Sequence, residues 1–333
     1  MSAGPSQQDA GHDERVTIQD VARGAGVSTG TVSRVLNDRP GVSPATRRRV
    51  LDTIAHLRYR PDHTARALSR QPLRIGLSLA AGTRRLMPFF MVFLEHLITV
   101  LQEDGYGLEE IPAGPDGLPE RLADGMVLHG VHDDDPRIAH LDRAGVPFVL
   151  VGHAEGARWV MPDDVGGARE ATRHLLRLGH QHVLYLGGRM SQQATQDRYQ
   201  GYREALAEAG LAPAEPVLVE GELDSLAAYR VVHRAFQAGR PATALFAASD
   251  EMALGAVAAL EDLGLRVPMD VSVVGFDDLP EIGAQLTTVR QDIGRITTTA
   301  VDLLREGLRG APVRDVTVPV QLVVRGTTAR RRE

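Results

Sequence analysis

Residues 27–37, VSTGTVSRVLN, place several hydrogen-bonding side chains on one side of a short helix. Ser28 is expected to cap this helix, because a serine oxygen at that position accepts hydrogen bonds from free N–H groups of the first turn. The polar face carries Thr29, Gly30, Ser33, Arg34 and Asn37. An arginine fork suits guanine edges or phosphates, and threonines such as Thr29 and Thr31 suit base edges, phosphates or a thymine methyl. The chemistry that this face could do is therefore contact with a polyanion such as DNA.

Two neighbouring helices are predicted to position that face. Thr17 and Asp20 have the spacing of a capping box for a helix over IQDVARGA, which Gly26 ends. A third helix starts at Ser43 and Pro44. Its apolar face is expected to be Val50, Leu51, Ile54 and Leu57. Two short helices joined by a tight turn form a helix-turn-helix, whose second helix enters the major groove of DNA. A generic three-helix bundle is the alternative.

Charge is unevenly distributed along the chain. Residues 1–74 hold 12 arginines against seven acidic residues, whereas the remainder holds 25 arginines against 36 acidic residues. A basic N-terminal segment joined to an acidic body indicates a polyanion-binding head on a larger domain. The distribution favours the DNA-binding interpretation of residues 15–60 over the plain bundle.

Several short motifs in residues 16–69 match a known family. TIQDVARGAGVS, TVSRVLN, VSPATR and YRPDHTARAL resemble the DNA-binding head of the LacI/GalR (lactose-repressor) family of bacterial transcription regulators. The resemblance implies that this segment contacts operator DNA. The implied DNA contacts are Thr17, Ser28, Thr29, Gly30, Thr31, Ser33, Arg34, Asn37 and Tyr59.

The segment 61–72 is expected to form a hinge helix. It begins with a proline, and it is too short to be a stable helix in water by itself. In the family this stretch folds on operator DNA, and a leucine from each subunit wedges into the central base step of the minor groove. Leu68 matches that leucine, and Ala65 and Arg66 match its neighbours. A plain linker with an incidental leucine is the alternative.

Beyond residue 73, short apolar runs alternate with helical segments. The predicted strands are 73–80, 107–111, 124–130, 147–153, 182–188, 216–222, 244–249, 271–277 and 318–324. Near-continuous apolar runs are typical of parallel strands that are covered on both faces. The alternation predicts two doubly wound α/β sheets, with ligands bound at the carboxyl ends of the strands in a cleft between two lobes.

This body resembles the effector domain of the same family, which is similar to periplasmic sugar-binding proteins. MPFF, LGH, RYQGYREAL, SDEMALGA, VSVVGFDD and LTTVRQD carry the resemblance. It implies a pocket for a small, carbohydrate-like effector. The implied ligand contacts are Phe89, Phe90, His153, Asp163, Arg198, Ser249 and Asp277. Trp159, the one tryptophan of the sequence, is predicted to lie near the same cleft.

The body also departs from the family pattern. Gly152 stands where relatives commonly end a strand with aspartate, and Ser249 replaces an asparagine. Asp163–Asp164 replaces Asp-Asn, and residues 112–123 are too short for a full crossover helix. These departures leave open whether the ligand is a simple hexose, and whether the pocket has kept small-molecule binding.

Composition excludes several kinds of chemistry. The chain has no cysteine and no lysine, which removes disulfides, thiolate metal sites, a phosphate-loop lysine and a Schiff-base amine. His129, His132 and residues 133–135, like His180 and His182, lack a convincing third metal ligand and are interpreted as solvated loop residues. No metal or cofactor is therefore expected.

The expected organisation is a disordered leader (1–14), the helix-turn-helix (15–60), the hinge (61–72), an effector-binding and dimerisation domain (73–328) and a tail (329–333). Without an apolar segment long enough for a membrane or a secretory signal, a cytoplasmic protein is expected. The expected function is a repressor that binds a pseudo-palindromic operator as a homodimer, under control of a carbohydrate-like effector. A solute-binding component, an effector-independent regulator and an enzyme are the alternatives, although no residue pattern favours catalysis.

Overall fold

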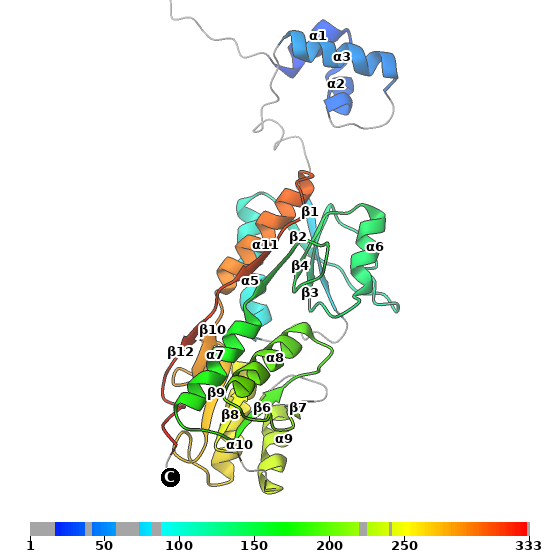
Figure 1. Cartoon of the computed structure of the whole chain (residues 1–333). Coiled ribbons are helices and arrows are strands. Elements are labelled where there is room, and N and C mark those ends of the chain that lie inside the picture. The colour runs from blue at the N-terminus through cyan, green and yellow to red at the C-terminus, as the bar shows by residue number, and fades with distance from the viewer. Residues whose placement is uncertain are drawn as a thin grey trace, which may run out of the picture. The chain divides into compact units, whose positions relative to one another are not determined.

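The computed structural model describes residues 17–36, 42–57, 73–80, 88–219, 225–239, 242–280 and 282–331. The chain divides into two compact units, Met1–Pro72 and Leu73–Glu333 (Figure 1). The predicted leader and the predicted hinge lie outside the described residues.

The first unit contains three short helices, α1 (Ile18–Ala25), α2 (Thr29–Leu36) and α3 (Pro44–His56). They pack around a small apolar core of Val21, Ala22, Ala25, Val32, Val35 and Val50. The predicted capping box is present, because Thr17 and Asp20 bond to each other's backbone N–H groups. The prediction for Leu51 was wrong, since its side chain is 49% exposed while Ile54 and Leu57 pack against the core.

The second unit is built on two six-stranded sheets. The first has the order β11-β5-β4-β3-β1-β2 and is parallel throughout, whereas the second has the order β12-β10-β9-β8-β6-β7 and is parallel except for β12. The strands of the first sheet are β1 (Arg74–Leu79), β2 (Gly107–Glu110), β3 (Gly125–His129), β4 (Phe148–Val151), β5 (Trp159–Pro162) and β11 (Asp315–Val318). Those of the second are β6 (Val183–Gly187), β7 (Val217–Leu218), β8 (Ala244–Ala247), β9 (Ser272–Asp277), β10 (Thr287–Arg290) and β12 (Gln321–Val323).

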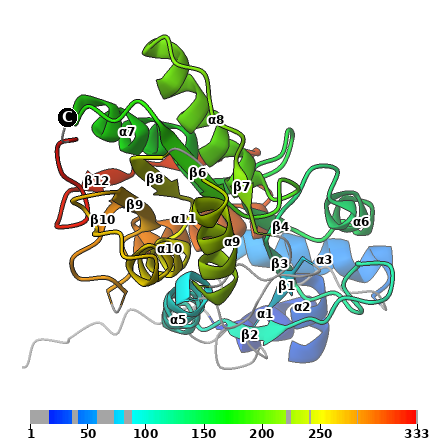
Figure 2. The same ribbon diagram turned by 90° about the horizontal axis from the view of Figure 1, so that it is seen from below.

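Helices cover both faces of each sheet. In the first lobe α5 and α11 pack together on one face, and α6 lies on the other. In the second lobe α7 and α8 lie on one face of the sheet, and α9 and α10 lie on the other (Figure 2). The bounds are α5 (Pro88–Glu103), α6 (Pro136–Ala144), α7 (Asp164–Arg177), α8 (Gln193–Glu208), α9 (Ser225–Gln237), α10 (Asp250–Asp262) and α11 (Ile293–Leu308).

This architecture confirms the predicted fold class of a helical head and a two-lobed α/β body. All nine predicted strands are present in part, but the strands β5, β10 and β11 were not predicted. Each of the three is only four residues long. The strand β5 ends in a proline, β10 begins with two threonines, and β11 has exposed positions, so none of them shows a long apolar run. Between β2 and β3 the chain makes a turn closed by an Ala113–Pro119 bridge in place of a crossover helix, as the length of 112–123 predicted.

The chain passes between the lobes three times, from β5 to α7, from β10 to α11 and from β11 to β12. These passages bring the carboxyl ends of strands from both lobes to one cleft, where ligands of doubly wound folds bind. Within the described ranges, no helix is long and apolar enough to cross a membrane.

Candidate functional site

The helix α2 presents a polar, solvent-facing surface. Ser28 caps it by accepting from the backbone N–H of Thr31 at 3.1 Å, and the two hydroxyls lie 3.0 Å apart. Thr29, Gly30 and Arg34 are exposed, while Val32 and Val35 face the core. Five of the predicted DNA contacts, Ser28, Thr29, Gly30, Thr31 and Arg34, thus lie at exposed or partly exposed positions of α2 and its cap.

Other predicted DNA contacts have different positions. Thr17 is used by the capping box of α1, where its hydroxyl lies 2.6 Å from the Asp20 carboxylate. Ser33 lies on α2, and its side chain is not among those that the structure describes. Asn37, Tyr59, Ala65, Arg66 and Leu68 lie outside the described residues.

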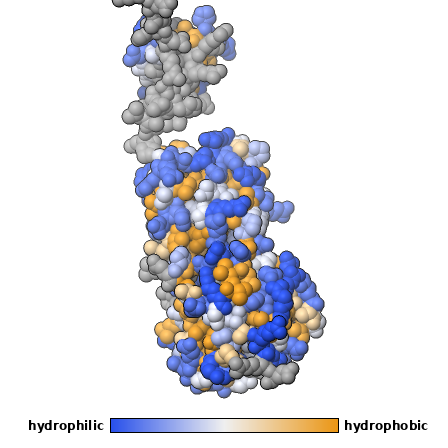
Figure 3. Space-filling view, turned by 90° about the vertical axis from the view of Figure 1, so that its left-hand side faces the viewer, coloured by the Kyte–Doolittle hydropathy of each residue, from blue (hydrophilic) through white to orange (hydrophobic). Residues whose placement is uncertain are grey.

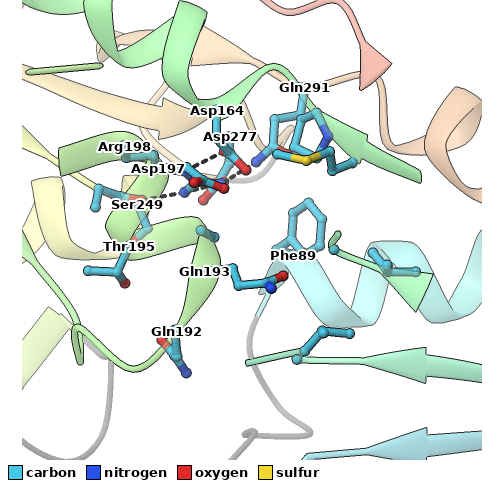
Figure 4. A pocket seen from close by; sticks show the side chains of 18 of the residues that line it. Phe89, Asp164, Gln192, Gln193, Thr195, Asp197, Arg198, Ser249, Asp277 and Gln291 are labelled. Carbon is cyan, nitrogen blue, oxygen red and sulfur yellow. Dashed lines mark hydrogen bonds and ion pairs between the residues drawn. The ribbon is translucent and has the colours of Figure 1, made fainter. Parts of the chain in front are cut away.

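The body contains a cavity of about 200 Å³ between its two lobes. The first lobe contributes residues at the ends of β3, β4 and β5, and the second contributes α8 and the starts of α7 and α10. Among the predicted contacts, the lining includes Phe89, His153, Arg198, Ser249 and Asp277. Most of the cavity wall is apolar, and Asp164, Asp277 and Arg198 converge at one end (Figure 4).

Arg198 organises that polar end. Its Nε donates to Asp164 Oδ1 at 2.7 Å, and its Nη1 donates to the carbonyl oxygen of Ala248. The same Nη1 lies 3.7 Å from Asp277 Oδ1, and the guanidinium carbon lies 3.8 Å from the centre of the Phe276 ring. Because a buried guanidinium needs such partners, the contacts hold Arg198 in one orientation at the cavity wall.

Asp277 ends β9 in an unusual backbone conformation. Its φ is 134°, and the next residue, Asp278, also has a positive φ of 56°. Gln291 donates to Asp277 Oδ1 at 2.6 Å, and the backbone N–H of Asp250 donates to Oδ2 at 3.4 Å. Burial raises the pKa of Asp277 well above its ordinary value, although the charge of Arg198 opposes this. Strained backbone of this kind persists where the surroundings hold it in place, often at ligand sites.

Of the remaining predicted contacts, Ser249 lines the cavity, whereas Asp163 and Phe90 do not. Ser249 caps α10 by accepting from the N–H of Met252 at 3.2 Å, and it also faces the cavity. Asp163 caps α7 through Gly166 and does not line the cavity, whereas the next residue, Asp164, does. Phe90 is 3% exposed and belongs to the core of the first lobe, so only Phe89 reaches the wall.

His129 is a wall residue that sequence reasoning missed. It ends β3, and its ring lies 5.3 Å from the rings of both Phe90 and Phe93. Its Nδ1 is buried without a hydrogen-bond partner among the described residues. The interpretation of His129 and His180 as solvated loop residues was wrong, because His180 is 3% exposed and bonds to Thr243 and Ala329. Within the described ranges, no group of three or more potential ligands could hold a metal ion.

Three buried or partly buried histidines predict that acid weakens the fold. Burial, together with the charge of Arg137, lowers the pKa of His129 to about 4, and burial also lowers the pKa values of His174 and His180. Since the unfolded chain takes up these protons first, the stabilisation is present above about pH 6.5 and is lost as the pH falls toward 4. For His129 the loss is on the order of 3 kcal/mol, at about 1.4 kcal/mol per pKa unit.

This prediction is tested by urea unfolding of the protein between pH 7.5 and 5. His129→Gln is expected to flatten the decline relative to the unsubstituted protein, whereas His182→Gln, at an exposed position, is expected to leave it unchanged. Equal slopes for all three proteins would show that His129 does not carry the pH dependence.

Each of the two units contains a segment that matches a known protein family. Residues 17–62 match the model of bacterial regulatory proteins of the lacI family, and residues 172–328 match the periplasmic binding protein-like domain. The chain is 34% identical over 330 residues to the HTH-type transcriptional regulator CelR of Thermobifida fusca, covering 93% of this chain and 96% of that protein. This chain belongs to the LacI family. The HTH-type transcriptional regulator GalR of Escherichia coli is also 34% identical, over 90% of this chain and 92% of GalR.

Solved structures of LacI-family proteins share the fold. A complex of the regulator CelR with cellobiose has a TM-score of 0.70 and 31% identity, over 94% of this chain and all of that one. The lac repressor dimer bound to operator and the anti-inducer ONPF has a TM-score of 0.68 and 28% identity, over 95% of this chain.

A departure of this LacI-family chain at Gly152 has a physical reason. Its φ is 141°, and a Cβ atom there would lie 3.0 Å from both Gln193 Oε1 and Val131. The close approach allows the Gln193 carboxamide to bond the backbone N–H and C=O of His153 at 3.0 and 2.8 Å. His153 Nε2 also lies 3.1 Å from Asp197 Oδ2, so these contacts tie the two lobes together at the cavity.

Proposed function

We propose that this chain is a transcription regulator whose head binds a pseudo-palindromic operator and whose body binds a small, carbohydrate-like effector. The observation that carries the DNA-binding part is the exposed face of α2, with Thr29, Thr31 and Arg34 on a packed three-helix head. A recognition helix of this kind enters the major groove with its N-terminal end first. The lac repressor bound to operator supports the same mode of binding here.

The effector part rests on the cavity between the lobes. A polar end around Arg198 and Asp277, joined to an apolar wall, suits a polyhydroxylated ring that hydrogen-bonds at one end and packs at the other. The CelR complex with cellobiose supports a carbohydrate-like ligand. A ligand that bridges the lobes would change their relative orientation, and operator affinity would change by the same coupling free energy.

A homodimer completes the proposal, because a two-fold axis matches two half-sites. Figure 3 shows hydrophobic side chains gathered in patches between hydrophilic ones on the face that it draws. Exposed apolar side chains on helices of the body include Met91 and Ile98 of α5, Leu226 of α9 and Leu254 of α10. Such side chains would be covered in a subunit interface. In the dimer, we assign the minor-groove wedge to Leu68 of each hinge.

The experiment is a fluorescence-anisotropy titration of labelled DNA from the region upstream of the protein's own gene. Binding is expected to weaken steeply as salt rises, because arginines release counterions from phosphates. A sugar screen then follows Trp159 fluorescence, since this ring lies 6.3 Å from that of His153. Salt-sensitive binding without any ligand response indicates an effector-independent regulator, and ligand binding without DNA binding indicates a solute-binding protein. A search for substrate turnover tests the enzyme alternative; CelR and GalR are both named as transcriptional regulators.

Gly30 is expected to set operator preference. A Cβ atom at this position meets only Ser28 Oγ, at 3.7 Å, so a side chain fits without moving the head. Replacing Gly30 with glutamine should add a base contact and should change stability by at most about 1 kcal/mol, in the favourable direction. Affinities for operators with single base-pair changes, together with a melting curve, check both expectations. Unchanged base preference would make Gly30 a spacer.

A further inference from the structure

The polar end of the cavity has more hydrogen-bond acceptors than donors. Arg198 uses Nε and Nη1 on acceptors of the protein, and Gln291 uses its Nε2 on Asp277. Asp164 Oδ2 makes no hydrogen bond to a described residue, and the Asp277 carboxylate has lone pairs beyond those that its two donors occupy. The donor groups that remain at this end are Arg198 Nη2 and the hydroxyl of Ser249, whose oxygen already accepts from Met252.

The side chain of Gln291 gives a second, independent sign. The residue is 5% exposed and lines the cavity, and its Oε1 is buried without a partner among the described residues. Figure 4 shows the side chain beside Asp277 at the polar end. A buried carbonyl oxygen without a hydrogen bond is costly, so this atom requires a donor.

The charged groups at this end of the cavity also indicate that a positively charged partner is missing. Asp164 and Asp277 lie at the wall, and Asp250, which is fully buried, lies directly behind Asp277. One guanidinium, that of Arg198, faces two of these carboxyls, Asp164 and Asp277. The N-terminal turns of α7 and α10 offset part of the negative charge. Burial raises the pKa values of all three carboxyls, and the charge of Arg198 opposes this rise only for Asp164 and Asp277.

The other charged groups of the cavity do not supply the missing cation. His153 is paired with Asp197 at 3.1 Å, and Arg189 is exposed. His129 lies among phenylalanine rings, and its pKa is lowered to about 4, so it is neutral near pH 7. The deficit therefore stays at the end formed by Asp164, Asp277 and Gln291.

We propose that the effector is a polyol that carries a protonated amine, with the ammonium group among Asp164, Asp277 and the Oε1 atom of Gln291. This assignment rests on the proposed ligand-binding function and names its ligand class. An ammonium group has three donors and no acceptor, which matches the excess of acceptors. A neighbouring hydroxyl oxygen accepts from Arg198 Nη2, so an amino sugar satisfies both requirements.

The test compares matched sugars by calorimetry with the full-length protein. D-glucosamine is set against D-glucose and N-acetyl-D-glucosamine, and the β-1,4-linked glucosamine disaccharide against cellobiose, at about pH 6.5. Each amine is expected to bind at least about tenfold more tightly than its neutral partners, as hydrogen bonds between charged groups allow. The preference is expected to disappear at about pH 9, where the amines are deprotonated. Equal or weaker binding of the amines, or no binding of any probe, overturns the proposal.

Two variants separate this ligand contact from general charge. Asp164→Asn is expected to remove most of the preference for the amine, measured as the ratio of the amine's affinity to that of its neutral partner with the same variant. Asp292→Asn removes a carboxylate next to Gln291 that caps α11 at an exposed position outside the cavity, and it is expected to keep the preference. A preference that survives Asp164→Asn in a protein that melts normally contradicts the assignment, and Asp277→Asn gives the same comparison if the first variant does not fold.

Operator titration of the same preparation separates a failure of the ligand assignment from a failure of the proposed regulator function. Amine binding without DNA binding would leave the ligand class standing and would remove the regulator. DNA binding that responds only to neutral sugars would keep the regulator and would remove the amine.

Discussion

Replacing Arg34 with alanine is expected to weaken operator binding by about 30- to 10⁴-fold. A bidentate arginine contact to a base is worth about 1–3 kcal/mol, and a dimer makes the contact twice. Arg34 is exposed in the last turn of α2, so its removal should change the free energy of unfolding by less than about 0.5 kcal/mol. Anisotropy titrations of the variant and the unsubstituted protein at one salt concentration measure the loss.

Two control variants separate base contact from charge. Arg23→Ala removes the same charge from α1, where Arg23 is exposed and pairs with Asp20 at 3.3 Å. Arg34→Lys keeps the charge but loses the planar fork. We expect Arg34→Lys to resemble Arg34→Ala and Arg23→Ala to have a much smaller effect. A loss for Arg34→Ala no larger than that for Arg23→Ala would assign Arg34 to general attraction.

Replacing Arg198 with methionine is expected to destabilise the body by about 3–5 kcal/mol. The change leaves Asp164 and Asp277 buried without their cation, and removing one partner of a buried ion pair costs about this much. The same change should abolish ligand binding in the cavity. Urea unfolding measures the first effect and calorimetry the second.

The double variant Arg198→Met with Asp164→Asn tests the cause. Removing the carboxylate of Asp164, which has lost its cation, should recover part of the lost stability. The effects of the two substitutions are then non-additive in a double-mutant cycle. Arg203→Met, at an exposed position on the same helix, is the matched control and should unfold nearly as the unsubstituted protein does. A loss below about 1 kcal/mol for Arg198→Met would show that its contacts do not hold the site together.

The head was predictable because its signals are local. The bonds between Thr17 and Asp20, and the cap at Ser28, form between residues three apart in the sequence. Leu51 was wrongly predicted to face the core. It is adjacent to Val50, and α3 buries only the side that carries Val50 against α1 and α2. Helical spacing alone does not decide which of two adjacent apolar residues faces the core.

The site was harder to predict, because its contacts join distant parts of the chain. Arg198, Asp164 and Asp277 meet through three different elements, and only the family resemblance pointed to two of them. The sequence could not separate Asp163 from Asp164, since helix capping turns one of two adjacent carboxylates away from the cavity. His129 and Gln291 were missed because their unpaired atoms become evident only once neighbouring strands are in place.

A binding-site selection from random double-stranded DNA with the full-length protein tests most directly whether this chain reads an operator as a dimer. We expect enrichment of one sequence with two inverted, similar half-sites, and loss of that enrichment with Arg34→Ala. Recovery of no common sequence, or of a single half-site without inverted symmetry, would contradict a dimeric regulator that reads its operator through α2.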